Sequence, residues 1–240
     1  MEKQPAKPAK STPASLAASK STREKVTPPD PALTGIDPGK GVKPKVVRDL
    51  LFDLVSKVPL SEEAVSHDPL SRSQVIARNA AKLAASVSGS LALPPGPLGM
   101  ATIIPDLVAI WRIQRKMVAD IAAVYGKTDI LTTEMMVFCL FKHGAAMLVR
   151  DLVVRAGGRL LVKRASLRTL QSALQKIGIR ITQKVIAKSI AHYVPLVGAL
   201  AIGGYAYYDT SRVAATAIDA FSRDIAIEDE PVKRKKAKDA

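Results

Sequence analysis

The sequence is poor in cysteine and in aromatic residues. Cys139 is the only cysteine among 240 residues, which excludes an internal disulfide framework and favours a reducing compartment. Aromatic residues make up only 4% of the chain, so its 48% hydrophobic content is mostly Ala, Val, Leu and Ile. That mixture suits closely packed helices better than a β-sandwich, whose strands favour aromatic and β-branched side chains. Residues 1–20 also lack the apolar run of a secretory signal peptide, which predicts a cytoplasmic protein or one on the cytoplasmic face of a membrane.

Positive charge is what the chain has in excess. Its formal net charge is +15; residues 1–45 carry nine Lys or Arg and four Asp or Glu, and residues 222–240 carry six and five. About +9 therefore remains on the residues between these ends. A strongly basic domain indicates a negatively charged partner, either nucleic acid or an anionic membrane surface.

The two ends of the chain have the composition of flexible extensions. Residues 1–45 hold half of the sixteen prolines and show neither helical nor strand periodicity, which predicts a disordered, Lys-, Pro- and Ala-rich arm. Residues 223–240 predict a charged flexible tail, in which an acidic cluster precedes a basic one. These ends can keep the protein soluble, or they can tether it electrostatically.

Between the ends, apolar residues recur at helical spacing, which predicts an all-α, single bundle-like domain over residues 46–222. Asp68 and Pro69 have the residue types of a helix cap and first position, and Gly126 that of a C-cap. We expect helices over residues 46–55, 69–91, 105–125, 133–155, 166–176, 180–193 and 209–221. The fourth of these helices should end at Gly157 and Gly158.

The helix expected over residues 105–125 has two polar residues on its apolar face, Asp106 and Gln114. A buried carboxylate is costly unless it is paired or hydrogen-bonded, so Asp106 should have a specific partner. Backbone N–H groups of the first helical turn can fill that role, and a ligand or ion is the alternative.

Two uncharged apolar segments, residues 83–105 and 189–208, are the most distinctive feature of the sequence. Each is long enough to cross a bilayer as a continuous helix, but Pro94–Pro97 break the first and Pro195 with three glycines breaks the second. Such segments form hairpins, either buried in the protein or dipping into the membrane, more readily than simple spans. Ala199 and Gly203, four residues apart, predict a face for close helix packing.

A basic tract precedes the second apolar segment: residues 142–188 contain eleven Lys or Arg and one acid, Asp151. This tract can be an ordinary solvated face. Basic amphipathic helices beside an apolar segment are also typical of proteins that bind anionic membrane surfaces. The candidate residues for that contact are Arg164, Arg168, Arg180, Lys184 and Lys188.

The sequence contains no constellation of catalytic residues. Cys139 and His143 have the i, i+4 spacing that could begin a metal site, but a core cysteine beside an ordinary histidine fits the same spacing. Glycine-rich fragments at residues 35–41 and 126–128 lack the context of a phosphate-binding loop. We therefore expect a non-enzymatic protein with no cofactor and no metal, and the sequence identifies no small-molecule substrate.

Short glycine- and proline-based motifs recur around the two apolar segments. They are Gly96-Pro97-Leu98-Gly99, Ile104-Pro105-Asp106-Leu107, Gln114, Ile121-Ala122 and Tyr125-Gly126, then Val194-Pro195-Leu196-Val197-Gly198-Ala199 and Gly203-Gly204. This series, within about residues 70–222, resembles the EcsC protein family and the helical C-terminal domain of some membrane-associated bacterial GTPases. The resemblance implies a bacterial, all-helical protein that works at membranes or with membrane machinery and has no established enzymatic activity. The chain departs from it in lacking a GTP-binding module and in placing three tyrosines, at 205, 207 and 208, where an Asn is expected.

These observations favour a membrane-associated helical adaptor, whose partner is an anionic membrane surface or a membrane protein complex. The alternative is a nucleic-acid-binding protein that uses the basic tract, although the stacking aromatics of single-strand binding are missing from it. An enzyme is a third hypothesis, which rests only on Asp106 and Gln114.

Overall fold

The computed structural model describes residues 44–91, 103–188 and 195–228. The expected disordered arm, except for its last two residues, lies outside this part, as do Pro94–Pro97 and Gly99. The middle of the first apolar segment and residues 189–194 of the second are therefore not described. Residues 195–208 of the second segment are helical throughout, so its three glycines do not break it as expected.

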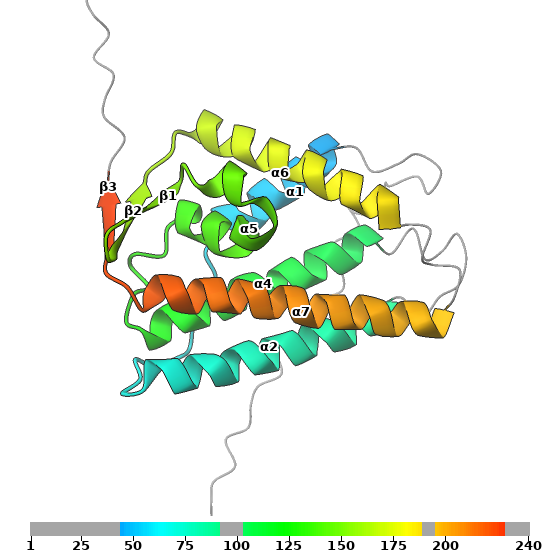
Figure 1. Cartoon of the computed structure of the whole chain (residues 1–240), viewed down its shortest axis with the longest axis horizontal. Helices are drawn as coiled ribbons and strands as arrows, with labels where there is room; N and C mark the ends of the chain where they lie inside the picture. The colour runs from blue at the N-terminus through cyan, green and yellow to red at the C-terminus, as the bar shows by residue number, and fades with distance from the viewer. Residues whose placement is uncertain (1–43, 92–102, 189–194, 229–240) are drawn as a thin grey trace, which may run out of the picture. The chain divides into compact units, whose positions relative to one another are not determined.

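Six helices and three strands lie within the described residues. The helices are α1 (Pro44–Ser56), α2 (Pro69–Leu91), α4 (Ile103–Val124), α5 (Thr133–Val149), α6 (Leu167–Lys188) and α7 (Pro195–Phe221). The strands are β1 (Val153–Ala156), β2 (Arg159–Lys163) and β3 (Ile225–Glu228). In Figure 1, α2, α4 and α7 run side by side, and α5, α6 and α1 lie above them.

The hydrophobic core lies between these two groups of helices. α4 crosses the core, and its apolar face buries Met117, Val118 and Ile121 as its periodicity predicts. Trp111 meets Phe141 of α5 edge to face, with ring centroids 6.2 Å apart. The predicted helical character of the domain is therefore confirmed.

Helix starts and ends follow the predicted signals. Pro69 is the first residue of α2, and the Asp68 carboxylate accepts a hydrogen bond from the backbone N–H of Ser71 at 3.1 Å. Gly126 has a φ of 66°, and the N–H groups of Gly126 and Lys127 donate to the carbonyls of Ala123 and Ala122. That pair of bonds is a Schellman cap, which confirms the role predicted for Gly126. The Lys127 ammonium in turn donates to the carbonyl of Phe221 at the end of α7, at 2.8 Å.

The prediction of an all-α domain is wrong in one region, because β1, β2 and β3 form a small sheet. β1 and β2 are antiparallel, and Ala156 pairs with Arg159 across Gly157 and Gly158. A Gly-Gly pair between short β-branched runs is a hairpin signal, here with Gly157 at a φ of 60°. The glycines that were expected to end a helix therefore form a strand turn, and the helix expected to reach residue 155 ends at Val149.

Three further boundaries differ from the predictions. α6 is one continuous helix where two were expected, and α7 runs unbroken from Pro195, so Asp209 lies midway along it rather than at a helix start. The expected flexible tail begins with a strand, because β3 pairs in parallel with β2 over residues 225–228. The two helix differences do not appear in apolar periodicity, since a helix that continues and one that restarts in phase have the same pattern.

No helix in the described ranges combines the length and apolar character needed to cross a membrane.

A close approach between backbones sets the packing of α2 against α7. A Cβ placed on Gly203 would lie 2.9 Å from the carbonyl oxygen of Ala85 and 3.7 Å from the Cα of Gly89. The close-packing face predicted around Gly203 therefore meets small residues of α2; the side chain of Ala199 is not described. Small residues allow helix axes to approach in this way because no side chain separates the backbones.

We predict that Gly203→Ala lowers the free energy of unfolding by about 1–3 kcal/mol, because the added methyl group must push α7 away from a backbone carbonyl. Urea unfolding followed by circular dichroism measures the change. Gly204→Ala is the matched control, since its Cβ would meet nothing within 4 Å and alanine favours the helix by about 1 kcal/mol. Equal stability of the two variants would show that the close approach does not constrain the fold.

Candidate functional site

Asp106 lies in the first turn of α4 and has the specific partner that its predicted inward position requires. The hydroxyl of Ser88, a buried residue of α2, donates to Asp106 Oδ1 at 2.7 Å. Burial raises the pKa of the Asp106 carboxyl, and the hydrogen bond from Ser88 opposes that change. This pair joins α2 to α4 across the first apolar segment, since Ser88 lies within that segment and Asp106 directly follows it.

Gln114 is the centre of a second polar contact, two turns further along α4. It is 1% exposed, and its side-chain amide donates to Asp209 Oδ2 at 2.8 Å and to the Thr210 hydroxyl at 3.2 Å. The other carboxylate oxygen of Asp209 lies 2.8 Å from His143 Nε2. We call Gln114, His143, Asp209 and Thr210 the polar cluster; it connects α4, α5 and α7.

The polar cluster lies beside an irregularity in α5. Ala145 has φ −145° and ψ 38°, which interrupts the helix two residues after His143. The Arg180 guanidinium of α6 approaches the Gly144 carbonyl there, at 3.4 Å. A kink of this kind loosens intrahelical bonds and leaves carbonyls open to other donors.

The chemistry available to the polar cluster is limited by what surrounds His143. Asp209 orients the imidazole, as in a general base, but Nδ1 is buried and has no partner among the described residues. Cys139, one turn earlier on α5, is fully buried, and burial raises the pKa of its thiol to about 12. Its thiol therefore stays protonated at neutral pH, and the described residues contain no group of three or more His, Cys, Asp or Glu suited to a metal ion.

Sequence reasoning found Asp106 and Gln114 but missed the pairing of His143 with Asp209. Gln114 and Asp106 share α4 yet bind different partners, so the structure does not bring them into one site. The available signal was a polar residue at a buried position on each of three helices, which predicts mutual pairing. Spacing along the chain could not supply the pairing, because His143 and Asp209 are 66 residues apart.

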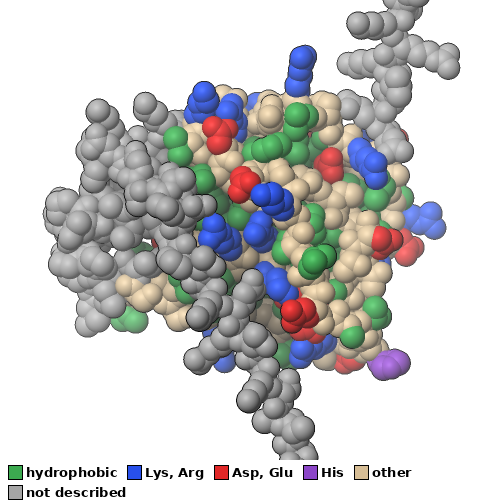
Figure 2. Space-filling view, turned by 180° about the vertical axis from the view of Figure 1, so that it is seen from behind, with side chains coloured by type: hydrophobic (Ala, Val, Ile, Leu, Met, Phe, Trp, Pro, Cys, Tyr) green, Lys and Arg blue, Asp and Glu red, His purple; other side chains and the backbone are tan. Residues whose placement is uncertain are grey.

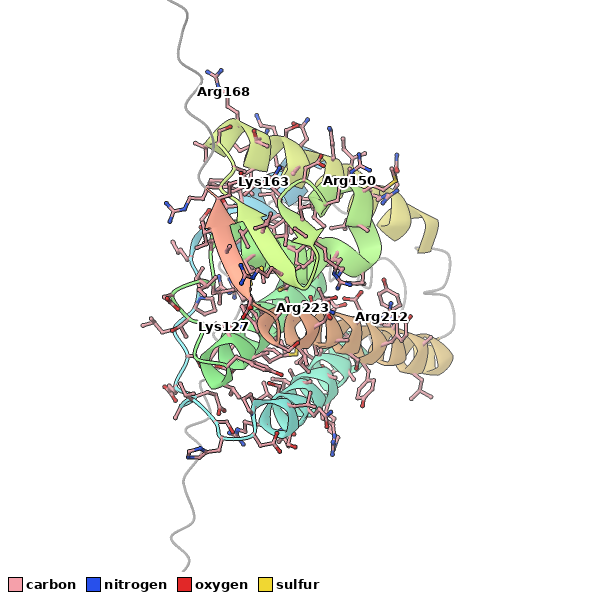
Figure 3. All side chains as sticks on the ribbon, turned by 60° about the vertical axis from the view of Figure 1, so that its left-hand side comes forward. Lys127, Arg150, Lys163, Arg168, Arg212 and Arg223 are labelled. Atoms are coloured by element: carbon pink, nitrogen blue, oxygen red, sulfur yellow. The ribbon has the colours of Figure 1, made fainter. Side chains whose placement is uncertain are left out.

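The predicted anionic-surface residues lie in different environments. Arg168 and Arg180 are exposed on α6, and Figure 3 shows Arg168 extending outward from the start of that helix. Arg164 follows β2, and its backbone N–H donates to the Glu228 carbonyl at 3.0 Å. Lys184 and Lys188 belong to the last turns of α6, where side chains are not described.

Part of the basic tract is neutralised by one carboxylate on α7. Asp219 forms ion pairs with Arg223 at 2.6 Å and with Arg155 at 2.8 Å, and Lys142 lies 3.9 Å away. The hydrogen bond from Arg223 is the main reason that the pKa of Asp219 lies below its usual range, and the surrounding positive charges add to it. The face shown in Figure 2, seen from behind, likewise carries Asp and Glu among its Lys and Arg side chains.

The N-terminal half of α7 exposes an apolar surface that charge and motif analysis did not predict. Leu200 is 74% exposed and Tyr208 60% exposed, and Tyr205 and Tyr207 are also exposed. At 100° per residue these four side chains spread over an arc of about 160° of α7, outside the arc of Gly203, Ala206 and Thr210, which face the core. We call Leu200, Tyr205, Tyr207 and Tyr208 the α7 apolar face. Of the other motif residues, Pro195 begins α7 and Gly198 lies in its first turn.

The chain matches no protein-family model, no curated protein and no solved structure.

We predict that Gln114→Ala lowers the free energy of unfolding by about 1–3 kcal/mol, because Asp209 and Thr210 lose a buried donor. Thermal and urea unfolding measure the loss. Gln171→Ala changes the same residue type at an exposed position of α6 and should stay within about 0.5 kcal/mol of the parent. A neutral effect of Gln114→Ala would contradict the role of the amide in holding the three helices together.

Native Cys139 should react with a thiol reagent only when the protein opens, because its thiol is buried and protonated. At pH 8 the native chain should be labelled at least about a hundredfold more slowly than the chain in urea, as expected for a core site. The raised thiol pKa also lowers stability as pH rises from the unfolded value of 9.0 towards about 12, since the unfolded state loses its proton first. Mass spectrometry after timed labelling checks the first expectation; rapid native labelling would refute it.

Proposed function

We propose that this protein is a non-enzymatic, membrane-associated adaptor, which binds anionic membrane surfaces through the α7 apolar face and the C-terminal part of α6. The observation that carries the proposal is the exposure of Leu200 and three tyrosines on one side of a folded helix. Exposed apolar patches on folded domains mark interaction sites, and tyrosine is enriched where an apolar layer meets water.

Positive charge lies close to the α7 apolar face. The end of α6 carries Arg180, Lys184 and Lys188, and seven chain steps separate Lys188 from Pro195, the start of α7. Seven steps span at most about 25 Å, so the end of α6 lies within that distance of the start of α7. Each Lys or Arg near an anionic membrane contributes about 1 kcal/mol to binding.

The resemblance of residues 70–222 to the EcsC family supports the same proposal, including a bacterial origin and a position at the cytoplasmic face of the membrane. Within the described residues, the resemblance rests on residues 105–126, in α4 and its C-terminal cap, and on the start of α7. Association with a membrane protein complex is a further part of the proposal, because the α7 apolar face suits a helical partner as well as lipid.

Nucleic-acid binding by the basic tract is the alternative function. Ion pairs within the tract are an argument against this alternative. Lys142 and Arg155 of the tract contact Asp219 rather than standing free for phosphate groups. A salt-dependent electrophoretic shift of DNA or RNA by the full chain would favour this alternative. The full chain is needed because a fragment ending at residue 222 would lack β3.

Vesicle flotation tests the proposal. The chain should float with vesicles of phosphatidylglycerol and phosphatidylcholine, and much less with phosphatidylcholine alone. Reversing Arg180, Lys184 and Lys188 to Glu should weaken binding more than about tenfold, whereas reversing Lys57, Arg159 and Lys163 makes the same charge change elsewhere and should weaken it less.

A second pair of variants tests the α7 apolar face. Leu200→Ser with Tyr208→Ser should abolish flotation, while Leu60→Ser with Val65→Ser, at positions at least as exposed, should leave it intact. Absence of flotation by the unaltered chain, or equal loss in both pairs, would overturn the proposal.

A further inference from the structure

A groove between the end of α5 and the first half of α6 is independent of the surface proposed above. It has a volume of about 380 Å³. One wall consists of α6 residues four positions apart, Arg168, Ser172 and Lys176, with Thr169 beside them. The opposite wall comes from Met147 and Leu148 of α5 and from the turn that follows.

The α6 wall is positively charged and rich in hydrogen-bond donors. Arg168 and Lys176 have no carboxylate partner among the described residues, and the Ser172 hydroxyl lies between them along the helix; the Thr169 hydroxyl is already hydrogen-bonded to that of Ser166 at 2.9 Å. The one acid of the groove, Asp151, is already 3.4 Å from the guanidinium of Arg150. The groove therefore has unpaired positive charge for a ligand with an anionic group.

The other wall is apolar and partly uncovered. Of its residues, Leu152 is buried, Leu148 and Ala173 are partly buried, and Met147 is 70% exposed. Methionine adapts its shape to irregular apolar ligands. An occupant that covers Met147 while placing an anion between Arg168 and Lys176 must have a polar end and an apolar end.

The size and charge of the groove narrow the choice of occupant. A volume of 380 Å³ is at the lower end of small-molecule pockets, which suits one alkyl chain with its head better than a two-chain lipid. The basic arm of this chain carries the same sign of charge as the groove and is disfavoured. The groove residues include no aromatic side chain on which a nucleic-acid base could stack.

We propose that the α5–α6 groove binds one single-chain anionic amphiphile, with its carboxylate or phosphate head on Arg168 and Lys176 and its alkyl chain on Met147, Leu148 and Leu152. This site is distinct from the membrane surface proposed for α7 and the end of α6. It gives the protein a means of sensing or carrying a soluble lipid-derived acid.

Isothermal titration of the full chain with decyl phosphate, below its micelle concentration, tests the proposal. We expect saturable binding of one molecule per chain. Inorganic phosphate and an uncharged decyl glycoside should each bind at least about tenfold more weakly, because one lacks the chain and the other lacks the charge.

Ser172→Asp is the decisive variant, since it places a negative charge at an exposed position between Arg168 and Lys176. It should weaken decyl phosphate binding more than about tenfold. Gln171→Asp, the matched control, adds the same charge at an exposed α6 position outside the groove and should change binding less than about threefold. Both variants should unfold at the same urea concentration as the parent.

The combined results of titration and vesicle flotation show whether the groove and the vesicle-binding surface are two separate sites. Loss of decyl phosphate binding by Ser172→Asp with unchanged flotation supports two separate sites. Binding that is equal for inorganic phosphate and decyl phosphate, equal loss in both variants, or no saturable binding by the parent would each overturn the groove proposal. None of these results depends on whether the parent chain floats with vesicles.

Discussion

The close approach of α7 to α2 at Gly203 is the constraint on which the rest of the arrangement depends. With only a hydrogen at this position, the α7 backbone can lie against the carbonyl of Ala85, and this contact fixes the rotation of α7 about its own axis. That rotation turns Thr210 and Asp209 towards α4 and α5, where Gln114 and His143 meet them. The same rotation leaves Leu200 and Tyr208 on the outside.

Two carboxylates of α7 hold the surrounding elements by charge and hydrogen bonding rather than by apolar contact. Asp209 joins α4 and α5 through partners of the polar cluster, and Asp219 joins β1 and α5 through Arg155 and Lys142. The Asp209 contact with His143 is partly buried and is therefore screened less than a surface ion pair, whereas Arg155, at 51% exposed, pairs with Asp219 near the surface. This arrangement explains how a domain with few aromatic residues fixes its helices in one register, since polar pairing specifies partners more narrowly than packing of Ala, Val and Leu does.

Local signals in the sequence predicted the helices and their caps. Such signals could not predict which distant segments of the chain pair with each other. Asp68, Pro69 and Gly126 act within one helical turn, so residue type alone indicated their roles. Gly157 and Gly158 were ambiguous because a glycine pair suits a helix end and a hairpin turn equally well. The third strand of the sheet could not be predicted, because the four residues of β3 have no pattern that distinguishes them from a short flexible tail. They form a strand by pairing with β2. Among the candidate site residues, the inward position of Gln114 followed from α4 periodicity, while its partners came from a helix almost a hundred residues later.

The parallel pairing of β3 with β2 has a consequence for the order in which the domain assembles. The β1–β2 hairpin closes over two residues and can form locally, but β3 reaches β2 only after the chain has passed through α6 and α7. A contact of such large sequence separation carries a loop-closure cost that only docked helices can offset. β3 therefore completes the sheet only after α6 and α7 have docked. Its dissociation from β2 would be the first sign that α7 has separated from the core.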